Sequence, residues 1–492
     1  MNALPRLSPA TLGLLPAHIS RPVYDRTRQG TSIIHFGIGA FHRAHQAAYF
    51  DTLMNAGEAN SRILGVSMRS EAVPKLLNPQ EGLFTLVSRD GNRHNSRVIG
   101  AIGPVLLAGR QSDAIIRGLV SPATNLATIT VTEKGYCLDP ATRRLDLDHP
   151  AIAEDLKNPN SPASLPGLLV AGLSARRAAG HGPLTILSCD NLFHNGRATR
   201  DAVLGFAAAT DSSLANWIEA ECAFPSSMVD RIVPATTPED IETLSAETGI
   251  LDPAMVKTEP FHQWVIEDRF ATRKPPLDHA GATFSNDVQG WEHAKLRLLN
   301  GAHSAMAYFG ALAGMESVHE AIEFSALRAH VERLWDEQEA TLNALAGFDP
   351  RSYRQQLVAR FRNSALDHRT RQIAMDGSQK LPQRLVAPLL ERRARGIPCP
   401  DQCLAIAAWM RWQTGSDEQG HPYTVDDPLA GTTREALARS DQDAGSMVRA
   451  LLSIPQVFDP KLAGDAHVVS ELTRSLGDLL TLGAKETLRR RM

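Results

Sequence analysis

The segment Lys295–His303 (KLRLLNGAH) contains polar side chains of the types that move protons. On an α-helix with about 100° between successive residues, His303 lies about 80° and Asn300 about 140° from Lys295. Glu292, on the same expected helix, lies about 60° away by the same count. These four side chains therefore share one partly apolar side of the helix. A surface helix with a salt-bridged Glu–Lys edge would show the same spacing.

Conversion of an alcohol into a ketone by hydride transfer needs groups of these kinds. A base must take the hydroxyl proton, and donors must hold the developing alkoxide. A lysine kept neutral by burial can be that base, which makes Lys295 the candidate. Asn300 offers an uncharged amide, and Gly301, unfavourable inside a helix, lets another backbone or a ligand come close. A second amide, Asn191, follows the expected strand Leu184–Ser188, at the edge where parallel sheets bind ligands.

The elements expected around these residues alternate in the first half of the chain. Short apolar runs predict buried parallel strands at Ser32–Gly37, Ile63–Ser67, Leu126–Thr132 and Leu184–Ser188. Amphipathic stretches between them predict helices at Phe41–Ala56, Ala114–Leu119 and Ser164–Ala179. The alternation predicts an α/β fold with a Rossmann-like, doubly wound parallel sheet.

The second half of the chain is helical in pattern. Helices are expected at Trp291–Ala313, Val318–Leu345, Tyr353–Asn363, Gln402–Gln413 and Gly445–Leu452. A chain of 492 residues is longer than one hydrophobic core supports, so two domains are expected. We place a dinucleotide-binding domain at 1–285 and a mostly α-helical substrate domain at 286–492.

The turn Gly37–Gly39 (GIG) joins the first expected strand to a helix. Glycines there let the backbone approach a dinucleotide diphosphate, which the helix N-terminus also attracts. His42 stands where G-x-G-x-x-G has its third glycine, and a tight turn without a ligand would look the same. After the second strand, Glu71 could accept from a ribose 2′-hydroxyl, whereas Arg69 could meet a 2′-phosphate. We expect NAD and leave NADP open.

Composition excludes several other classes of function. The net charge of −3 gives no electrostatic reason to expect nucleic acid or an anionic membrane as partner. No apolar stretch reaches the roughly 18–20 residues of a membrane span, and no signal-peptide pattern is present. The five cysteines are scattered, no Cys and His spacing fits a catalytic zinc, and no Tyr-x3-Lys dyad occurs. We expect a cytoplasmic, metal-independent enzyme for a small molecule, as a monomer or weak oligomer.

Seven motifs lie in order along most of the chain: GIGAFHRAH (Gly37–His45), TVTEKGYC (Thr130–Cys137), SCDN (Ser188–Asn191), FPSSMVDRIVP (Phe224–Pro234), EPFHQWVIED (Glu259–Asp268), KLRLLNGAH (Lys295–His303) and DGSQKLP (Asp376–Pro382). In this set the chain resembles the polyol-specific long-chain dehydrogenases, the mannitol dehydrogenase family. The resemblance implies zinc-independent catalysis with Lys295 as general acid/base, Asn191 and Asn300 at the substrate oxygen, and His303 orienting substrate and lysine.

The resemblance also implies further binding residues. Phe41, Thr132 and Glu133 lie within motifs expected at the cofactor. Asp230 and Lys380 match positions that line the sugar pocket. Without the resemblance, Asp230 would be read as the partner of the adjacent arginine, and Lys380 as an exposed lysine.

Within the family the fructuronate reductase branch is the closer match. The segments His368–Arg384 and Trp409–Arg411 resemble that branch, and Gln372 stands where mannitol dehydrogenases carry arginine. The basic residues that could read a distant carboxylate are Arg369, Arg371, Lys380 and Arg384. We expect D-fructuronate and D-mannonate as substrates, with D-fructose and D-mannitol or another polyol as the alternative. A dinucleotide-binding sensor without turnover is a reading of a different class.

Overall fold

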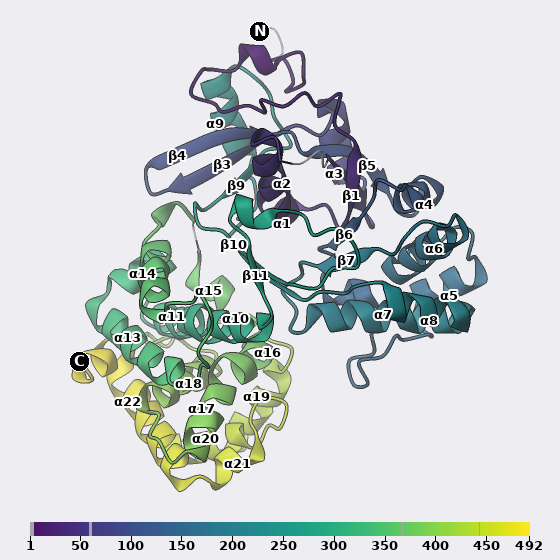
Figure 1. The fold of residues 1–492 in the computed structure, drawn as a ribbon. Helices are drawn as coiled ribbons and strands as arrows, with labels where there is room; N and C mark the ends of the chain where they lie inside the picture. The colour runs from purple at the N-terminus through teal and green to yellow at the C-terminus, as the bar shows by residue number, and fades with distance from the viewer. Residues whose placement is uncertain (1–3, 59–61, 367, 442) are drawn as a thin grey trace. The chain divides into compact units, whose positions relative to one another are not determined.

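The computed structural model describes residues 4–58, 62–366, 368–441 and 443–492, which form two compact units, 1–289 and 290–492. The boundary expected from the sequence lies near residue 285. Each unit is described separately (Figure 1).

The first unit is built on a parallel sheet. In the described part of the chain, its five strands are β1 (Thr31–Phe36), β2 (Arg62–Ser67), β5 (Ile102–Leu107), β6 (Leu126–Ile129) and β7 (Thr185–Ser188). Their order is β5-β2-β1-β6-β7, and every neighbouring pair is parallel. The Rossmann-like sheet expected from the sequence is thereby confirmed, with β5 as a strand that the sequence analysis missed.

The helices of this unit are α1 (Ala40–Ala44), α2 (Gln46–Asn55), α3 (Ala72–Leu77), α4 (Ser112–Val120), α5 (Pro150–Lys157), α6 (Leu165–Ala178), α7 (Asn195–Thr210), α8 (Ser212–Glu221) and α9 (Pro238–Thr248). The single helix expected at Phe41–Ala56 is wrong. His45, with φ −110° and ψ −89°, separates α1 from α2.

Two hydrophobic cores cover the two faces of the parallel sheet. Ile33 belongs to the core that includes α2, whereas the next residue, Ile34, belongs to the core that includes α4 and α6. Successive residues of a strand point to opposite faces, so both faces of β1 are buried. Figure 1 shows α2 on one side of the sheet and α4 and α6 on the other.

Two small sheets complete this unit, and the sequence analysis predicted neither. One has the order β4-β3-β9, with β3 (Phe84–Asp90), β4 (Arg93–Ile99) and β9 (Val256–Thr258). The other has the order β11-β10-β8, with β8 (Ser227–Asp230), β10 (Gln263–Glu267) and β11 (Thr283–Ser285). Strands β3 and β4 form an antiparallel hairpin.

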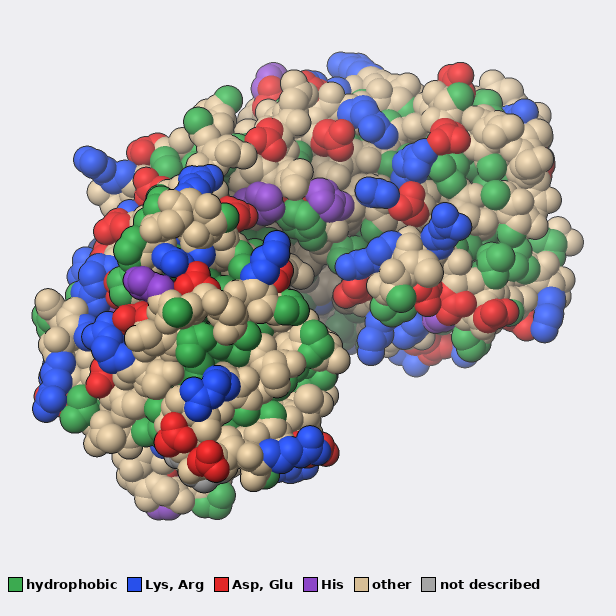
Figure 2. Space-filling view, turned by 90° about the horizontal axis from the view of Figure 1, so that it is seen from below, with side chains coloured by type: hydrophobic (Ala, Val, Ile, Leu, Met, Phe, Trp, Pro, Cys, Tyr) green, Lys and Arg blue, Asp and Glu red, His purple; other side chains and the backbone are tan. Residues whose placement is uncertain are grey.

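The second unit is helical, as expected. Its helices are α10 (Val288–Ala294), which begins just before the division, a π-helix (Lys295–Gly301), α11 (Ala302–Leu312), α12 (Val318–Glu323), α13 (Ser325–Glu339), α14 (Pro350–Phe361), α15 (Thr370–Ile373), α16 (Gly377–Leu381), a second π-helix (Pro382–Val386), α17 (Ala387–Ala394), α18 (Pro400–Trp412), α19 (Ala430–Ala438), α20 (Ala444–Leu452), α21 (Pro460–Gly464) and α22 (Ala466–Arg490). The helix expected at Val318–Leu345 is interrupted at Phe324 and ends at Glu339. On the face shown in Figure 2, Lys and Arg side chains are interspersed with Asp and Glu side chains.

The π-helix Lys295–Gly301 corrects the regular α-helix expected at Trp291–Ala313. A π-helix bonds residue i to i+5, so the angular count made for an α-helix does not apply to this segment. Two side chains from elsewhere in the unit donate to its carbonyls. Trp335 Nε1 donates to Leu298 O at 2.7 Å, and Arg384 donates to Asn300 O at 3.4 Å.

Gly301, at the end of this π-helix, allows a close approach of helix α13. A Cβ atom at this position would lie 2.7 Å from Gln338 Nε2 and 2.9 Å from Gln338 Oε1. The Gln338 side chain is fully buried and donates to Arg384 O at 2.8 Å. The partner that approaches the glycine is therefore a side-chain amide of the same unit, not a ligand or a backbone.

Replacement of Gly301 by alanine should lower the thermal unfolding midpoint. The gain of about 1 kcal/mol in helix propensity is outweighed by overpacking, which costs about 1–3 kcal/mol, because Gln338 must move and lose its bond to Arg384 O. Thermal unfolding of Gly301→Ala in the native and the Gln338→Ala backgrounds measures this. We expect a much smaller loss in the second background, and equal losses would show that the amide is not the obstacle.

Candidate active site

Most of the expected cofactor residues lie at one edge of the parallel sheet. Gly37 and Gly39 follow β1, Arg69 and Glu71 follow β2, Thr132 and Glu133 follow β6, and Asn191 follows β7. Because these strands are parallel, their carboxyl ends meet at the same edge. The chain runs from β1 through β2 to β5 on one side of the sheet, and then crosses to β6 and β7 on the other side of β1. Parallel sheets bind dinucleotides at the point where the strand order reverses in this way.

The turn after β1 requires a glycine at position 37. Gly37 has a φ of +95°, and a Cβ atom would lie 2.0 Å from Thr130 O. Gly37 N donates to Val66 O at 2.8 Å, and Thr130 Oγ1 donates to Gly37 O at 2.9 Å. The turn is thus held between β2 and the end of β6, with bare backbone leading through Gly39 into α1. This geometry fits the close approach of a diphosphate.

A pair of stacked histidines lies under this turn. His42, at the place of the third glycine, is fully buried and stacks on His35 with ring centroids 3.4 Å apart. The two ring nitrogens of His35 hydrogen-bond to the hydroxyls of Thr128 and Thr130. Burial lowers the pKa of His35 to about 3 and that of His42 well below its usual value, so both rings are neutral. The sequence analysis missed His35, whose signal was a polar residue inside an apolar strand.

The end of β2 combines an acceptor with several cations. The Glu71 carboxylate pairs with Lys75 at 2.7 Å and with Arg110 at 2.5 Å. The hydrogen bond from Lys75 and the charge of Arg110 lower the pKa of Glu71. Arg69 is exposed beside them. The group expected to accept from a ribose hydroxyl is therefore already paired, and Arg110 was not anticipated.

Asp190 joins the loops that follow β6 and β7, and the sequence analysis missed it. Its carboxylate accepts from Thr132 N at 2.8 Å, Val131 N at 3.1 Å and the Tyr136 hydroxyl at 2.7 Å. Burial raises the pKa of Asp190 against the opposing effect of these donors. Thr132 has a φ of +68°, a conformation that side chains rarely adopt. Asp190 thus holds this loop directly beside Asn191.

In the helical unit, Lys295, Asn300 and His303 are each only 8% exposed. Lys295 and Asn300 are five residues apart within the π-helix, which places them on adjacent turns. His303 follows Asn300 by three residues, one turn further along in α11. The π-helix therefore brings the lysine and the amide closer in angle than the α-helical count suggested.

The His303 ring lies among aromatic and basic side chains. Its centroid is 4.8 Å from that of Phe361 and 5.5 Å from that of His368. Burial, with the nearby His368 and Arg384, lowers the pKa of His303 well below its usual value. Among the described residues, His303 Nε2 has no hydrogen-bond partner. The ring is thus a neutral group with one nitrogen available to a ligand.

The basic residues expected to read a carboxylate have different surroundings. Arg371 lies over the rings of Trp412 and Tyr423, at 5.9 and 5.4 Å from their centroids. Arg384 is half-buried and donates to Asn300 O of the π-helix. Lys380 Nζ donates to Ile373 O at 3.3 Å and to Met375 O at 2.5 Å, and burial lowers its pKa.

The remaining expected residues lie in the first unit. Asp230 is buried at the end of β8, and the guanidinium of Arg231 donates to carbonyls of other segments. Phe41 stacks on His45 with centroids 5.1 Å apart. Glu133 is exposed and pairs with Arg143 at 3.4 Å.

Comparison with known families matches both units. Residues 31–279 match the model of the mannitol dehydrogenase Rossmann domain, and residues 287–480 match that of the mannitol dehydrogenase C-terminal domain. The chain belongs to the mannitol dehydrogenase family. The family expected from the motifs is confirmed, as is the class of oxidoreductase.

Individual proteins of known sequence or structure match this chain over nearly its full length. The uncharacterized oxidoreductase YeiQ of Escherichia coli (strain K12) is 41% identical over 96% of this chain and 97% of its own. The D-mannonate oxidoreductase of the same strain is 39% identical over 95% and 97%. The structure of Pseudomonas fluorescens mannitol 2-dehydrogenase with NAD and D-mannitol has 36% identity and a TM-score of 0.83 over 99% of both chains.

The described residues contain neither a cluster of metal ligands nor a membrane-spanning helix. No group of three or more His, Cys, Asp or Glu side chains in that part of the chain is placed to hold a metal ion. No helix among those residues is long and apolar enough to cross a membrane.

Replacement of Asp190 by asparagine should weaken cofactor binding. An amide presents one acceptor oxygen where the carboxylate serves three donors, so at least one buried donor loses its partner, at about 1–3 kcal/mol. We expect the Kd for NADH, measured by fluorescence titration, to rise roughly 5- to 100-fold. Asp201→Asn, a partly exposed change on α7, is the control. A lowered unfolding midpoint with an unchanged Kd would limit Asp190 to a structural role.

Proposed function

We propose that this protein interconverts a secondary alcohol and a ketone next to the terminal CH2OH of a linear sugar acid, with NAD as cofactor and Lys295 as general acid/base. The substrate pair that we favour is D-mannonate and D-fructuronate. The main support is the buried π-helix, which places Lys295 and Asn300 on adjacent turns with the neutral His303 one turn beyond.

Each of these groups has a distinct task in the proposed reaction. NAD, when bound, supplies the acceptor for the hydride that leaves the carbinol carbon. Lys295 takes the hydroxyl proton during oxidation and returns it during reduction. The Asn300 amide donates to the substrate oxygen as its negative charge develops. His303 Nε2 orients a neighbouring hydroxyl, and Asn191 is our candidate for a second amide donor.

The preference for NAD over NADP rests on Glu71 at the end of β2. A carboxylate there accepts from the ribose 2′-hydroxyl and repels a 2′-phosphate. Because Arg110 and Lys75 neutralise it, the repulsion is weakened. We therefore propose NAD as the preferred cofactor and NADP as a poorer one.

A sugar acid is favoured over a neutral polyol by two observations. The D-mannonate oxidoreductase of Escherichia coli is among the relatives that match almost the whole chain. Lys380 donates to the carbonyls of Ile373 and Met375, and its Nζ lies 4.0 Å from Asp376 Oδ2. Its third N–H is our candidate donor to a substrate carboxylate. The alternative, D-mannitol and D-fructose, is supported by the solved mannitol 2-dehydrogenase.

Replacement of Lys295 by alanine tests the acid/base assignment. The variant should lose about 10²–10⁴-fold in kcat, because one positioned acid/base contributes that much. The Kd for NADH should stay within twofold, and an added primary amine such as methylamine should restore part of the rate. Steady-state assays in both directions measure this. Near-native kcat with an unchanged pH profile would eliminate the mechanism.

Replacement of Lys380 by alanine tests the substrate class. If Lys380 reads the carboxylate, kcat/KM should fall roughly 10- to 100-fold for D-fructuronate, the effect of losing one charged hydrogen bond, and less for D-fructose. Arg371→Ala should show the same preference if it shares this role, and the exposed Lys485→Ala is the control. Equal losses on both substrates would show that neither residue reads the carboxylate.

A further inference from the structure

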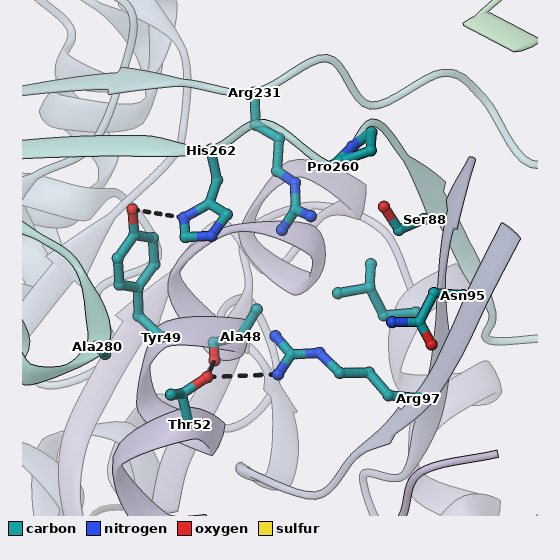
Figure 3. A pocket seen from close by; sticks show the side chains of 11 residues that line it. Ala48, Tyr49, Thr52, Ser88, Asn95, Arg97, Arg231, Pro260, His262 and Ala280 are labelled. Atoms are coloured by element: carbon teal, nitrogen blue, oxygen red, sulfur yellow. Dashed lines mark hydrogen bonds between the residues drawn. The ribbon is translucent and has the colours of Figure 1, made fainter. Parts of the chain in front are cut away.

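A cavity of about 370 Å³ lies in the first unit (Figure 3). Its walls come from α2, the β3–β4 hairpin and the segments around Arg231 and Pro260. None of the residues expected to bind cofactor or substrate lines it. The cavity is therefore a feature that the proposed reaction does not use.

Two arginines face this cavity from opposite sides. Figure 3 shows the guanidinium of Arg231 reaching in from one wall and that of Arg97 from the other. Among the described residues that line the cavity, none is acidic. Ser88 and Asn95 add uncharged polar groups to the same walls. Two cations without a lining carboxylate are the arrangement that binds an oxyanion.

Arg231 is held rigidly by backbone carbonyls. Its guanidinium donates to Ala44 O at 2.5 Å and to Glu259 O at 3.3 and 3.0 Å. These bonds use three of the five N–H groups, which leaves two for a ligand. Burial, together with the charge of Arg97, lowers the pKa of Arg231 to about 10, so it remains charged at neutral pH.

The side chain of Arg97, on β4, donates to Thr52 Oγ1 at 3.3 Å. The nearby carboxylate of Asp51 is buried outside the lining, where it accepts from Tyr24, Asn55 and Gly100 N. The charge of Arg97 opposes the rise in the pKa of Asp51 that burial causes, and the Glu259 carboxylate likewise opposes the fall in the pKa of Arg231. Both carboxylates accept from other donors, Glu259 from Ile232 N at 2.8 Å, and neither lines the cavity.

The pKa of His262, which lines the cavity, is affected by the positive charge of the two arginines. His262 Nδ1 is hydrogen-bonded to the Tyr49 hydroxyl at 2.8 Å. Burial and the charges of Arg231 and Arg97 lower the pKa of His262 to about 4, so the ring is neutral at physiological pH. The two arginines thus supply the charge of this site, and a bound anion would compensate it.

We propose that this cavity binds a phosphoryl dianion, seated between the guanidinium groups of Arg97 and Arg231. The cavity is larger than an inorganic phosphate ion and has room for the phosphoryl group of a small phosphorylated metabolite together with the atoms next to it. Each guanidinium offers paired N–H donors to phosphate oxygens. Because no residue assigned to the proposed reaction lines the cavity, the test of this site does not depend on that reaction.

Isothermal titration of the full-length protein with inorganic phosphate and, separately, with glucose 6-phosphate tests this site. The protein is first saturated with NADH, so that the diphosphate-binding edge of the sheet is filled. Ionic strength is held constant with chloride. The variant is Arg97→Gln, and the matched control is Arg93→Gln, an exposed residue of the same strand that does not line the cavity.

The wild-type protein and Arg93→Gln should bind at one saturable site, and Arg97→Gln should bind about 10- to 100-fold more weakly with an unchanged unfolding midpoint. Tighter binding of glucose 6-phosphate would assign the site to phosphorylated metabolites, and binding of inorganic phosphate alone would assign it to the free ion. Absence of saturable binding, or equal affinities in all three proteins, would overturn the proposal.

Discussion

The buried carbonyl groups of the π-helix Lys295–Gly301 must keep hydrogen-bond donors, and the helical unit is arranged around that requirement. A π-helix replaces the regular bonding pattern of the flanking α-helices, and a buried carbonyl without a donor would cost about 1–3 kcal/mol. The Trp335 indole and the Arg384 guanidinium supply donors to Leu298 O and Asn300 O. These contacts stabilise a helical form in which a lysine and an amide five residues apart occupy adjacent turns.

At the carboxyl edge of the parallel sheet in the first unit, loops are also held in place by side-chain hydrogen bonds. Loops that must leave their backbone open to a ligand cannot be held by secondary structure alone. The bond from Thr130 to Gly37 O holds the first loop, and the Asp190 carboxylate holds the loops after β6 and β7. In both units, side chains that touch no substrate in the proposed reaction fix the positions of those that do.

The periodic pattern of apolar residues predicted parallel strands and the helical second half, and seven motifs carried the resemblance to the family, because all of these depend on local sequence. Features that depend on distant partners were missed. The π-helix could not be read from KLRLLNGAH, since its donors lie 37 and 84 residues away from the carbonyls that they satisfy. The stacking of His42 on His35 replaces the third glycine by a contact between strand and helix that no spacing rule describes. The two small mixed sheets were missed because most of their strands are short and β9 lies far along the chain from β3, with which it pairs in parallel.

In the proposed mechanism the π-helix presents Lys295 and Asn300 together to one substrate oxygen. The most direct measurement is a crystal structure of the abortive complex with NADH and D-mannonate, in which hydride transfer cannot proceed. We expect the reacting hydroxyl oxygen to lie about 2.6–3.2 Å from both Lys295 Nζ and Asn300 Nδ2, with Lys295–Gly301 still π-helical. A hydroxyl bonded to other groups, with Lys295 Nζ out of hydrogen-bond reach, would contradict it.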